Sequence, residues 1–208
     1  MAGNKKQVLV IHGGDFFDTR EAFFTDLKKQ SFDAEELAPE ERKRWKDNLA
    51  ADLGSGYEVF RPRMPLPMFA RYEEWKVWFE KMIPHMRDGI VLVGHSLGGT
   101  FLVRYLGENT LSVKVRALFL IAPYFAARKG SPEADSGWTI GSIDSLEPQT
   151  GDAFIYQSED DTNVPVSHAK EYASRIPKAR LVIFKDRGHF RTERFPELAT
   201  CIKSLFDK

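Results

Sequence analysis

The stretch of sequence that decides the fold is VLVGHSLGG, Val91 to Gly99. An apolar run typical of a buried strand ends at Gly94, and Ser96 stands among glycines where that run stops. The residues Gly94-His95-Ser96-Leu97-Gly98 fit G-x-S-x-G, the nucleophile elbow, in which a strand turns into a helix within a few residues. The serine of such an elbow takes a strained backbone conformation that exposes its hydroxyl above the sheet. A plain turn is the alternative interpretation, and the rest of the chain decides between the two.

Six short apolar runs predict strands that are buried on both faces. Such continuous Val, Ile, Leu and Phe runs are typical of a parallel sheet covered by helices. The runs are Gln7–Ile11, Tyr57–Pro62, Gly89–Val93, Val115–Ala122, Ala153–Ser158 and Arg180–Phe184. Patterns with helical spacing lie between them, over Phe69–Ile83, Ser96–Glu108, Pro165–Ile176 and Phe195–Phe206. This alternation predicts one α/β domain over residues 1–208, with a mostly parallel sheet of about six strands and helices on both faces.

Two segments interrupt the alternation. Asp15–Leu53 is long for a first crossover, and we expect two helices in it. The second should have a solvated face, because the segment is highly charged around Glu35–Asp47. Phe125–Gln149 is rich in Gly, Ser, Pro and Asp, which predicts an ordered loop or a short cap over the sheet. We therefore expect no large lid.

Charge and cysteine content exclude several classes of function. Lys plus Arg is 30 and Asp plus Glu is 30, so the formal net charge is +0, which argues against nucleic acid or an anionic membrane as partner. No apolar stretch approaches the ~18 residues of a membrane span. Cys201 is the single cysteine, which excludes an internal disulfide and a metal site with several cysteine ligands. We expect a cytoplasmic protein with a small-molecule substrate.

A serine nucleophile needs a base to accept its proton. In elbow-containing folds the acid and then the histidine follow the serine along the chain. Only His168 and His189 lie beyond Ser96. His168 falls inside a helical pattern, where it is most simply an exposed residue. His189 follows the last apolar run and should lie at the carboxyl edge of the sheet, where catalytic groups gather in such folds. It is the predicted base.

The acid should lie on the loop after Ala153–Ser158, which begins Glu159-Asp160-Asp161. Turn formation or helix capping is the simplest role for any one of these carboxylates. The spacing to Pro165, where the next helix begins, favours Asp161 as the triad acid, with Asp160 as the alternative. Its role would be to accept the Nδ1 hydrogen of the histidine and to stabilise the imidazolium.

An oxyanion hole needs two donors. The predicted donors are the backbone N–H of Leu97, at the start of a helix, and that of Gly14, in the loop after the first strand, with Asp15 as the alternative to Gly14. His12 in that loop is more simply structural. Aromatic residues on the loops near the expected site could line a substrate pocket: Phe16, Phe17, Tyr124, Trp138 and Phe190. Packing is the usual role of such residues.

Three stretches together, VLVGHSLGG, SEDDTNVP (Ser158–Pro165) and RGHF (Arg187–Phe190), resemble the α/β-hydrolase superfamily. More narrowly, the chain is similar to small serine hydrolases of the retinoblastoma-binding-protein-9 type over most of Tyr57–Lys208. The resemblance implies a compact hydrolase without a large lid, with a Ser-Asp-His triad at Ser96, Asp161 and His189, that cleaves esters or amides. The L-x-C-x-E motif behind the family's name is absent, so binding to a retinoblastoma-type pocket is not implied.

The sequence therefore predicts a serine hydrolase that acts on small esters, with amides and thioesters as further candidates. Neither a cofactor nor a metal is expected in this chemistry. The alternative belongs to another class, a non-catalytic protein-interaction module that retains the hydrolase fold, because a fold does not fix a function.

Overall fold

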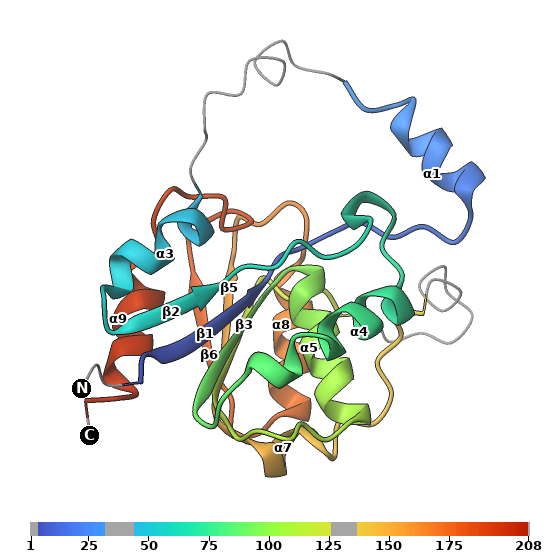
Figure 1. Ribbon diagram of the computed structural model, residues 1–208. Coiled ribbons are helices and arrows are strands. Elements are labelled where there is room, and N and C mark those ends of the chain that lie inside the picture. The colour runs from blue at the N-terminus through green and yellow to red at the C-terminus, as the bar shows by residue number, and fades with distance from the viewer. Residues whose placement is uncertain (1–3, 32–43, 126–136, 208) are drawn as a thin grey trace.

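The computed structural model describes residues 4–31, 44–125 and 137–207 (Figure 1). Its strands form one sheet in the order β2-β1-β3-β4-β5-β6, and all neighbouring strands run parallel. The strands are β1 (Lys6–Ile11), β2 (Tyr57–Phe60), β3 (Ile90–His95), β4 (Val115–Ile121), β5 (Thr150–Ser158) and β6 (Arg180–Phe184). The predicted sheet of about six strands is confirmed, with boundaries within a few residues of the predicted ones.

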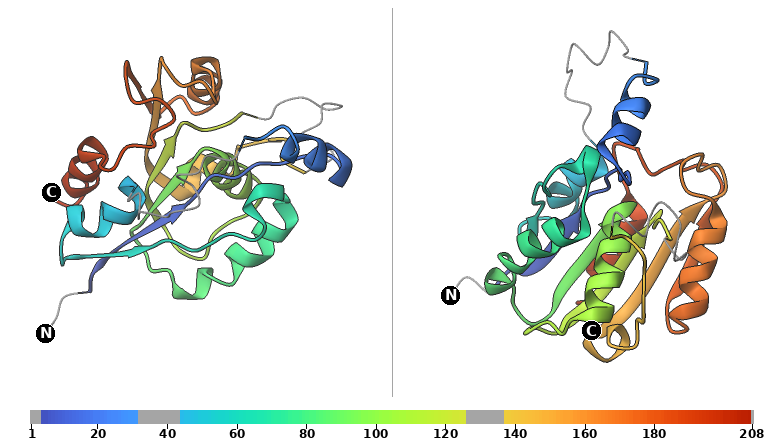
Figure 2. Two further views of the ribbon diagram at one scale, coloured as in Figure 1. Left: turned by 90° about the horizontal axis from the view of Figure 1, so that it is seen from above. Right: turned by 90° about the vertical axis from the view of Figure 1, so that its right-hand side faces the viewer.

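Helices cover both faces of this sheet (Figure 2). The α-helices are α1 (Arg20–Leu27), α3 (Trp45–Leu53), α4 (Tyr72–Glu80), α5 (Leu97–Glu108), α7 (Leu146–Gln149), α8 (Val166–Arg175) and α9 (Pro196–Ser204), with 3₁₀ turns at Pro67–Phe69 and Ile83–His85. One face is covered by α3 and α9, and the other by α4, α5 and α8. Among the described residues, no helix combines the length and the apolar character that a bilayer span requires.

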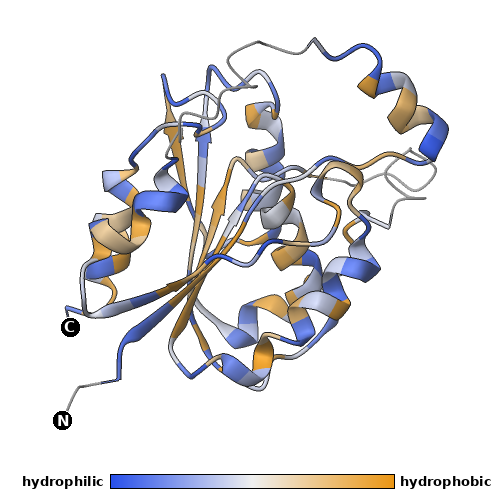
Figure 3. Ribbon diagram, turned by 45° about the horizontal axis from the view of Figure 1, so that its top comes forward, coloured by the Kyte–Doolittle hydropathy of each residue, from blue (hydrophilic) through white to orange (hydrophobic). Residues whose placement is uncertain are grey.

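The two faces of the sheet carry separate hydrophobic cores. Successive side chains of a strand point to opposite faces, so a strand covered on both sides must be apolar throughout. In β1, Leu9 and Ile11 belong to the core under α4, α5 and α8, whereas Val8 and Val10 belong to the core under α3 and α9. This is why the inner strands read as continuous apolar runs, and Figure 3 shows them largely in the hydrophobic colour. The prediction of burial on both faces is wrong for β2 and β6, in which no residue is buried, because they are the edge strands of the sheet.

The first crossover contains helices at both ends of its described part. None of the residues of α1 is buried. In α3, by contrast, Trp45, Leu49 and Leu53 are buried at a spacing of four residues and pack beneath the sheet beside α9. The predicted solvated face around Glu35–Asp47 lies mostly outside the described residues. In α3 itself, the side that carries Trp45, Leu49 and Leu53 is part of the core.

The segment Phe125–Gln149 differs from the predicted cap in one respect. Residues 126–136 lie outside the described residues, but Trp138, which the sequence placed in the substrate pocket, is fully buried. Its ring meets that of Trp75 edge-on with centroids 5.1 Å apart, and its Nε1 donates to the Ala70 carbonyl at 3.1 Å. The prediction for Trp138 is wrong because this side chain belongs to the core beneath the site.

Replacing Trp138 with alanine should therefore destabilise the protein strongly. Removing a large buried aromatic side chain leaves a cavity and costs about 3–5 kcal/mol of unfolding free energy. Trp78 is a matched control, because 44% of it is exposed. Trp78→Ala should cost less than about 1 kcal/mol. Urea unfolding followed by circular dichroism measures both, and equal losses in the two variants would contradict the assignment of Trp138 to the core.

Candidate functional site

The sharp turn from β3 to α5 places Ser96 at the carboxyl edge of the sheet. Its backbone has φ 53° and ψ -124°, a positive φ that residues other than glycine rarely adopt. A Cβ on Gly94 would lie 2.6 Å from the Gly98 carbonyl oxygen, and a Cβ on Gly98 would collide with the Ile11 carbonyl. Both glycines of the G-x-S-x-G motif are thus required by the close approach of α5 to β3 and β1.

The loop after β1 closes over the serine. A Cβ on Gly13 would lie 2.9 Å from the Ser96 Cβ, so the backbone of this loop passes directly beside the serine. Among the described residues, no backbone carbonyl accepts the N–H of Gly14 or of Leu97, whereas the N–H of Asp15 already donates to the Pro67 carbonyl at 2.8 Å. The two predicted oxyanion donors therefore remain available to a ligand.

His189 and Asp161 come together from neighbouring loops, after β6 and β5. The His189 Nδ1 lies 2.8 Å from the Asp161 Oδ2. The other carboxylate oxygen of Asp161 accepts the N–H groups of Asn163, at 2.8 Å, and Val164, at 3.0 Å, and its side chain is fully buried. Since a carboxylate only accepts, Nδ1 carries the hydrogen and Nε2 is left as the ring nitrogen that can accept a proton.

Asp160, the alternative acid, is held elsewhere. It accepts the Ser158 hydroxyl at 2.5 Å and the Gly188 N–H at 2.8 Å. These hydrogen bonds, the hydroxyl one first, lower the pKa of the Asp160 carboxyl. Asp160 therefore joins the loop after β5 to the loop that carries His189, while Asp161 contacts the histidine ring itself.

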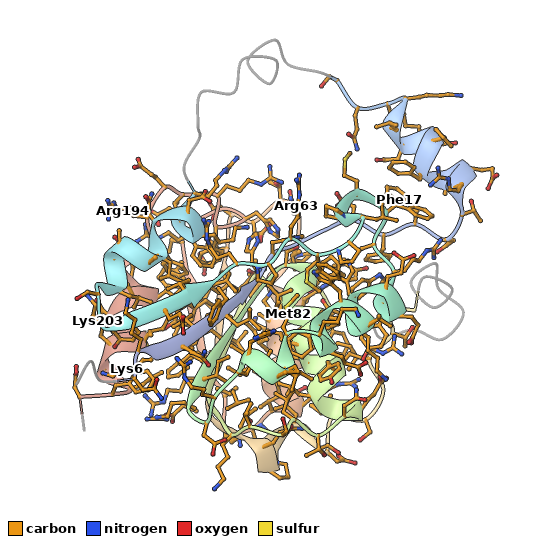
Figure 4. All side chains as sticks on the ribbon, viewed as in Figure 1. Lys6, Phe17, Arg63, Met82, Arg194 and Lys203 are labelled. Carbon is orange, nitrogen blue, oxygen red and sulfur yellow. The ribbon has the colours of Figure 1, made fainter. Side chains whose placement is uncertain are left out.

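A pocket of about 600 Å³ opens at this edge of the sheet. Its lining includes the predicted nucleophile, base and oxyanion donors, namely Ser96, His189, Leu97 and Gly14. Of the five aromatic residues predicted to line it, three do so: Phe16, Tyr124 and Phe190. Phe17 instead stacks on Phe69 with centroids 6.5 Å apart, beside α1 (Figure 4). Trp138 lies in the core, as described above.

Two other histidines have structural partners. The Nε2 of His12 accepts the Met64 N–H at 2.9 Å, and burial is the main cause that lowers its pKa. The Nδ1 of His168 accepts the Phe125 N–H at 2.9 Å, and its ring packs edge-on against Tyr124. The expectation of an exposed His168 is therefore wrong, because it binds the backbone of the loop after β4.

Two residues at the site escaped the sequence analysis, His95 and Lys46. His95 is buried, and its Nε2 donates to the His189 carbonyl at 2.9 Å while its Nδ1 accepts from the Lys46 Nζ at 3.2 Å. Burial, and then the charge of Lys46, lower the pKa of His95 well below its usual value, so it is neutral. The signal that could have found Lys46 is the four-residue spacing of Trp45, Leu49 and Leu53, which marks α3 as a packed helix.

No three His, Cys, Asp or Glu side chains within residues 4–31, 44–125 and 137–207 are grouped so that they could hold a metal ion. The polar side-chain groups of the pocket are hydroxyl, imidazole, carboxylate, amide, ammonium and guanidinium groups.

Comparison with known proteins assigns the chain to a family. Residues 37–201 match the family described as serine hydrolase. The chain belongs to this serine hydrolase family. A relative from Rattus norvegicus, serine hydrolase RBBP9, is 30% identical over 155 residues, which cover 72% of this chain and 78% of the relative. The YdeN protein of Bacillus subtilis (strain 168) is 27% identical over 209 residues, 98% of this chain and 97% of YdeN.

Solved structures show that this serine hydrolase has the α/β-hydrolase fold. The crystal structure of the B. subtilis ydeN gene product superposes with a TM-score of 0.73 at 24% identity and covers 98% of this chain and 100% of that one. Carboxylesterase CesB of B. subtilis gives a TM-score of 0.57 at 14% identity, covering 99% of this chain and 85% of its own. The resemblance drawn from the sequence motifs is confirmed.

The close packing at the elbow makes a specific prediction for Gly98. Gly98→Ala should lower the unfolding free energy by about 1–3 kcal/mol, because the methyl group would press on the backbone of β1, which cannot move aside. The matched control is Gly141→Ala, where no atom lies within 4 Å of the added Cβ. That variant should be neutral or gain up to about 1 kcal/mol. Thermal and urea unfolding compare them, and an unaffected Gly98→Ala protein would argue against the packing described.

Proposed function

We propose that this serine hydrolase cleaves small esters through an acyl-enzyme, with Ser96 as nucleophile, His189 as base and Asp161 as the acid that orients it. The observation that carries the proposal is the 2.8 Å contact between the His189 Nδ1 and the Asp161 Oδ2 at a pocket that Ser96 also lines. That contact leaves Nε2 to accept a proton from the serine hydroxyl, which is a poor nucleophile without a base.

The first half of the reaction transfers the acyl group to the enzyme. The Ser96 Oγ forms a bond to the ester carbonyl carbon as its proton moves to the His189 Nε2. The tetrahedral intermediate then collapses, the bond to the leaving oxygen breaks, and the same proton passes to that oxygen. Buried Asp161 keeps its negative charge and stabilises the transient imidazolium.

The second half releases the acid. Water attacks the acyl carbon, gives one proton to the His189 Nε2, and Ser96 regains its proton as the acyl–oxygen bond breaks. In both halves negative charge builds up on the carbonyl oxygen, where the N–H groups of Leu97 and Gly14 can donate to it. Removing one such donor typically costs about 10²–10³ in kcat, so these two backbone groups carry a large share of the catalysis.

Small substrates fit the pocket. Its volume of about 600 Å³ is within the usual range for small-molecule sites. Phe16 and Tyr124, whose ring centroids are 5.4 Å apart, offer an aromatic surface for a short acyl chain. Amides and thioesters could pass through the same intermediates. Assays with thioesters and aminoacyl amides, named in the next paragraph, test them.

The proposed roles of Ser96 as nucleophile and His189 as base are tested by equivalent substitutions. Ser96→Ala and His189→Ala should each lower kcat/KM for p-nitrophenyl acetate by about 10⁴ or more, because triad residues act as a unit. A fluorophosphonate serine probe should label the wild type and not Ser96→Ala. Unchanged circular dichroism spectra control for folding. A folded wild type that neither reacts with the probe nor cleaves esters, thioesters and aminoacyl amides would favour the alternative, a non-catalytic interaction module.

The choice between the two aspartates has its own test. Asp161→Asn removes the carboxylate that orients His189 and should lower kcat by about 10³–10⁴. Asp160→Asn is the matched control, one residue away, and should keep activity within about tenfold, because Asp160 binds Ser158 and Gly188 rather than the histidine. The reverse ranking would make Asp160 the triad acid.

A further inference from the structure

Positive charge is concentrated on one side of the pocket. Arg44 and Lys46 reach it from the start of α3, and Arg191 follows His189 by two residues. Arg63, labelled near the top of the molecule in Figure 4, joins Arg44 and Lys46 around an adjoining hollow of about 260 Å³. The whole chain carries equal numbers of acidic and basic residues. An overall excess of basic residues therefore does not explain why these cations are grouped at the pocket.

Few carboxylates balance these cations. Asp47 forms an ion pair with Arg61, also at the adjoining hollow. Asp15 lines the pocket from the loop after β1, and burial raises its pKa. Within the described parts of the chain, no carboxylate forms an ion pair with Arg44, Lys46, Arg63 or Arg191. This side of the pocket is therefore set up to attract an anion.

Lys46 is connected to His189 through His95. Its Nζ donates to the Nδ1 of His95, whose ring centroid lies 4.9 Å from that of His189. Burial, and then the neighbouring Arg44, lower the pKa of Lys46 to about 8. Burying the Lys46 ammonium group costs free energy, and the neutral imidazole of His95 cannot offset this cost. An anion bound beside the ammonium group would offset it.

The reaction geometry says which end of the substrate meets these cations. The His189 Nε2 must return its proton to the leaving oxygen, so the leaving group departs on the His189 side. His95 is on this side, because its Nε2 donates to the His189 carbonyl at 2.9 Å, and it brings Lys46 with it through the contact between its Nδ1 and the Lys46 Nζ. Arg191 follows His189 by two residues and lines the same pocket. The loop that carries Gly14 also brings Phe16 into the pocket, where its ring centroid lies 5.4 Å from that of Tyr124, so an aromatic surface lies near this proposed oxyanion donor.

We infer that the substrate's leaving group carries a carboxylate, which binds Lys46 and Arg191. This inference rests on the proposed function and narrows its substrate class to esters of hydroxy acids. Arginine suits the role because its planar guanidinium can donate two parallel hydrogen bonds to one carboxylate. Acyl transfer itself is unchanged: the hydroxy acid leaves with the proton from His189, and water later releases the short-chain acid.

The test compares two acetates that differ in one charge, 4-carboxyphenyl acetate and 4-carbamoylphenyl acetate. For each enzyme the measured quantity is the ratio of kcat/KM for the anionic ester to that for the neutral ester. The wild type should have the higher ratio. Lys46→Gln, which keeps a donor for His95, and Arg191→Gln should each lower it about tenfold, and Lys46→Arg should largely preserve it. Lys170→Gln, on an exposed position of α8, should leave it unchanged.

Salt provides a measurement on the unmutated protein. Raising ionic strength should lower the wild-type ratio, because screening weakens attraction between charges. This measurement needs no substituted protein, so it tests the inference even if a variant does not fold.

The outcomes separate the inference from the proposed function. Ser96-dependent cleavage of both acetates with the same ratio in wild type and Lys46→Gln would overturn the anion site and leave the hydrolase function standing. A charge preference found only for 4-nitrophenyl hemisuccinate over 4-nitrophenyl butyrate would place the anion on the acyl side and overturn the assignment to the leaving group. A folded wild type that cleaves neither acetate and is not labelled by the fluorophosphonate would overturn both.

Discussion

The close approach of α5 to the first strand is the constraint on which the rest of the site depends. Gly98 lies against the carbonyl groups of Ile11 and His12, so the helix begins directly over the end of β1. This contact leaves room for only one residue between β3 and α5, and that residue, Ser96, must take a positive φ. The loop that carries Gly13 and Gly14 passes directly beside this serine, because a Cβ on Gly13 would lie 3.4 Å from the Ser96 Oγ. A single packing contact thus positions both the proposed nucleophile and the proposed oxyanion donors.

The proposed base, His189, is positioned by a different part of the chain. The loop that carries His189 is held by the start of α3, where the Trp45 N–H donates to the Thr192 carbonyl at 2.9 Å and the Trp45 indole to the Phe190 carbonyl at 3.0 Å. Asn48 adds a hydrogen bond to the Glu193 carbonyl at 3.0 Å. The first crossover therefore supports the final loop, so α3 forms part of the site although it lies far from His189 in sequence.

The sequence allowed the sheet to be predicted because the four inner strands are apolar on both faces and the crossovers have helical spacing. The G-x-S-x-G motif, the order of the later residues and the loops after β5 and β6 were likewise local signals. Trp138 was misplaced because its Gly- and Ser-rich surroundings resemble a surface loop, whereas its burial depends on Trp75 and Ala70, distant in sequence. Lys46 was missed for the same kind of reason: a lysine in a charged segment is usually solvated, and only the docking of α3 brings it to His95.

The strand order also has a consequence for synthesis of the chain. The strands after β3 add one by one toward the edge, so β6 pairs last and covers the open side of β5. Until β6 leaves the ribosome, β5 is an unprotected edge that includes Phe154, Ile155 and Tyr156, and such edges are prone to pair with other chains. The loop that carries His189 is synthesised after β6. Until then, α3 lacks the loop to which it hydrogen-bonds. The last strand to be made therefore covers the edge of β5 and leads into the loop that carries His189, and a chain terminated before β6 would be prone to aggregate.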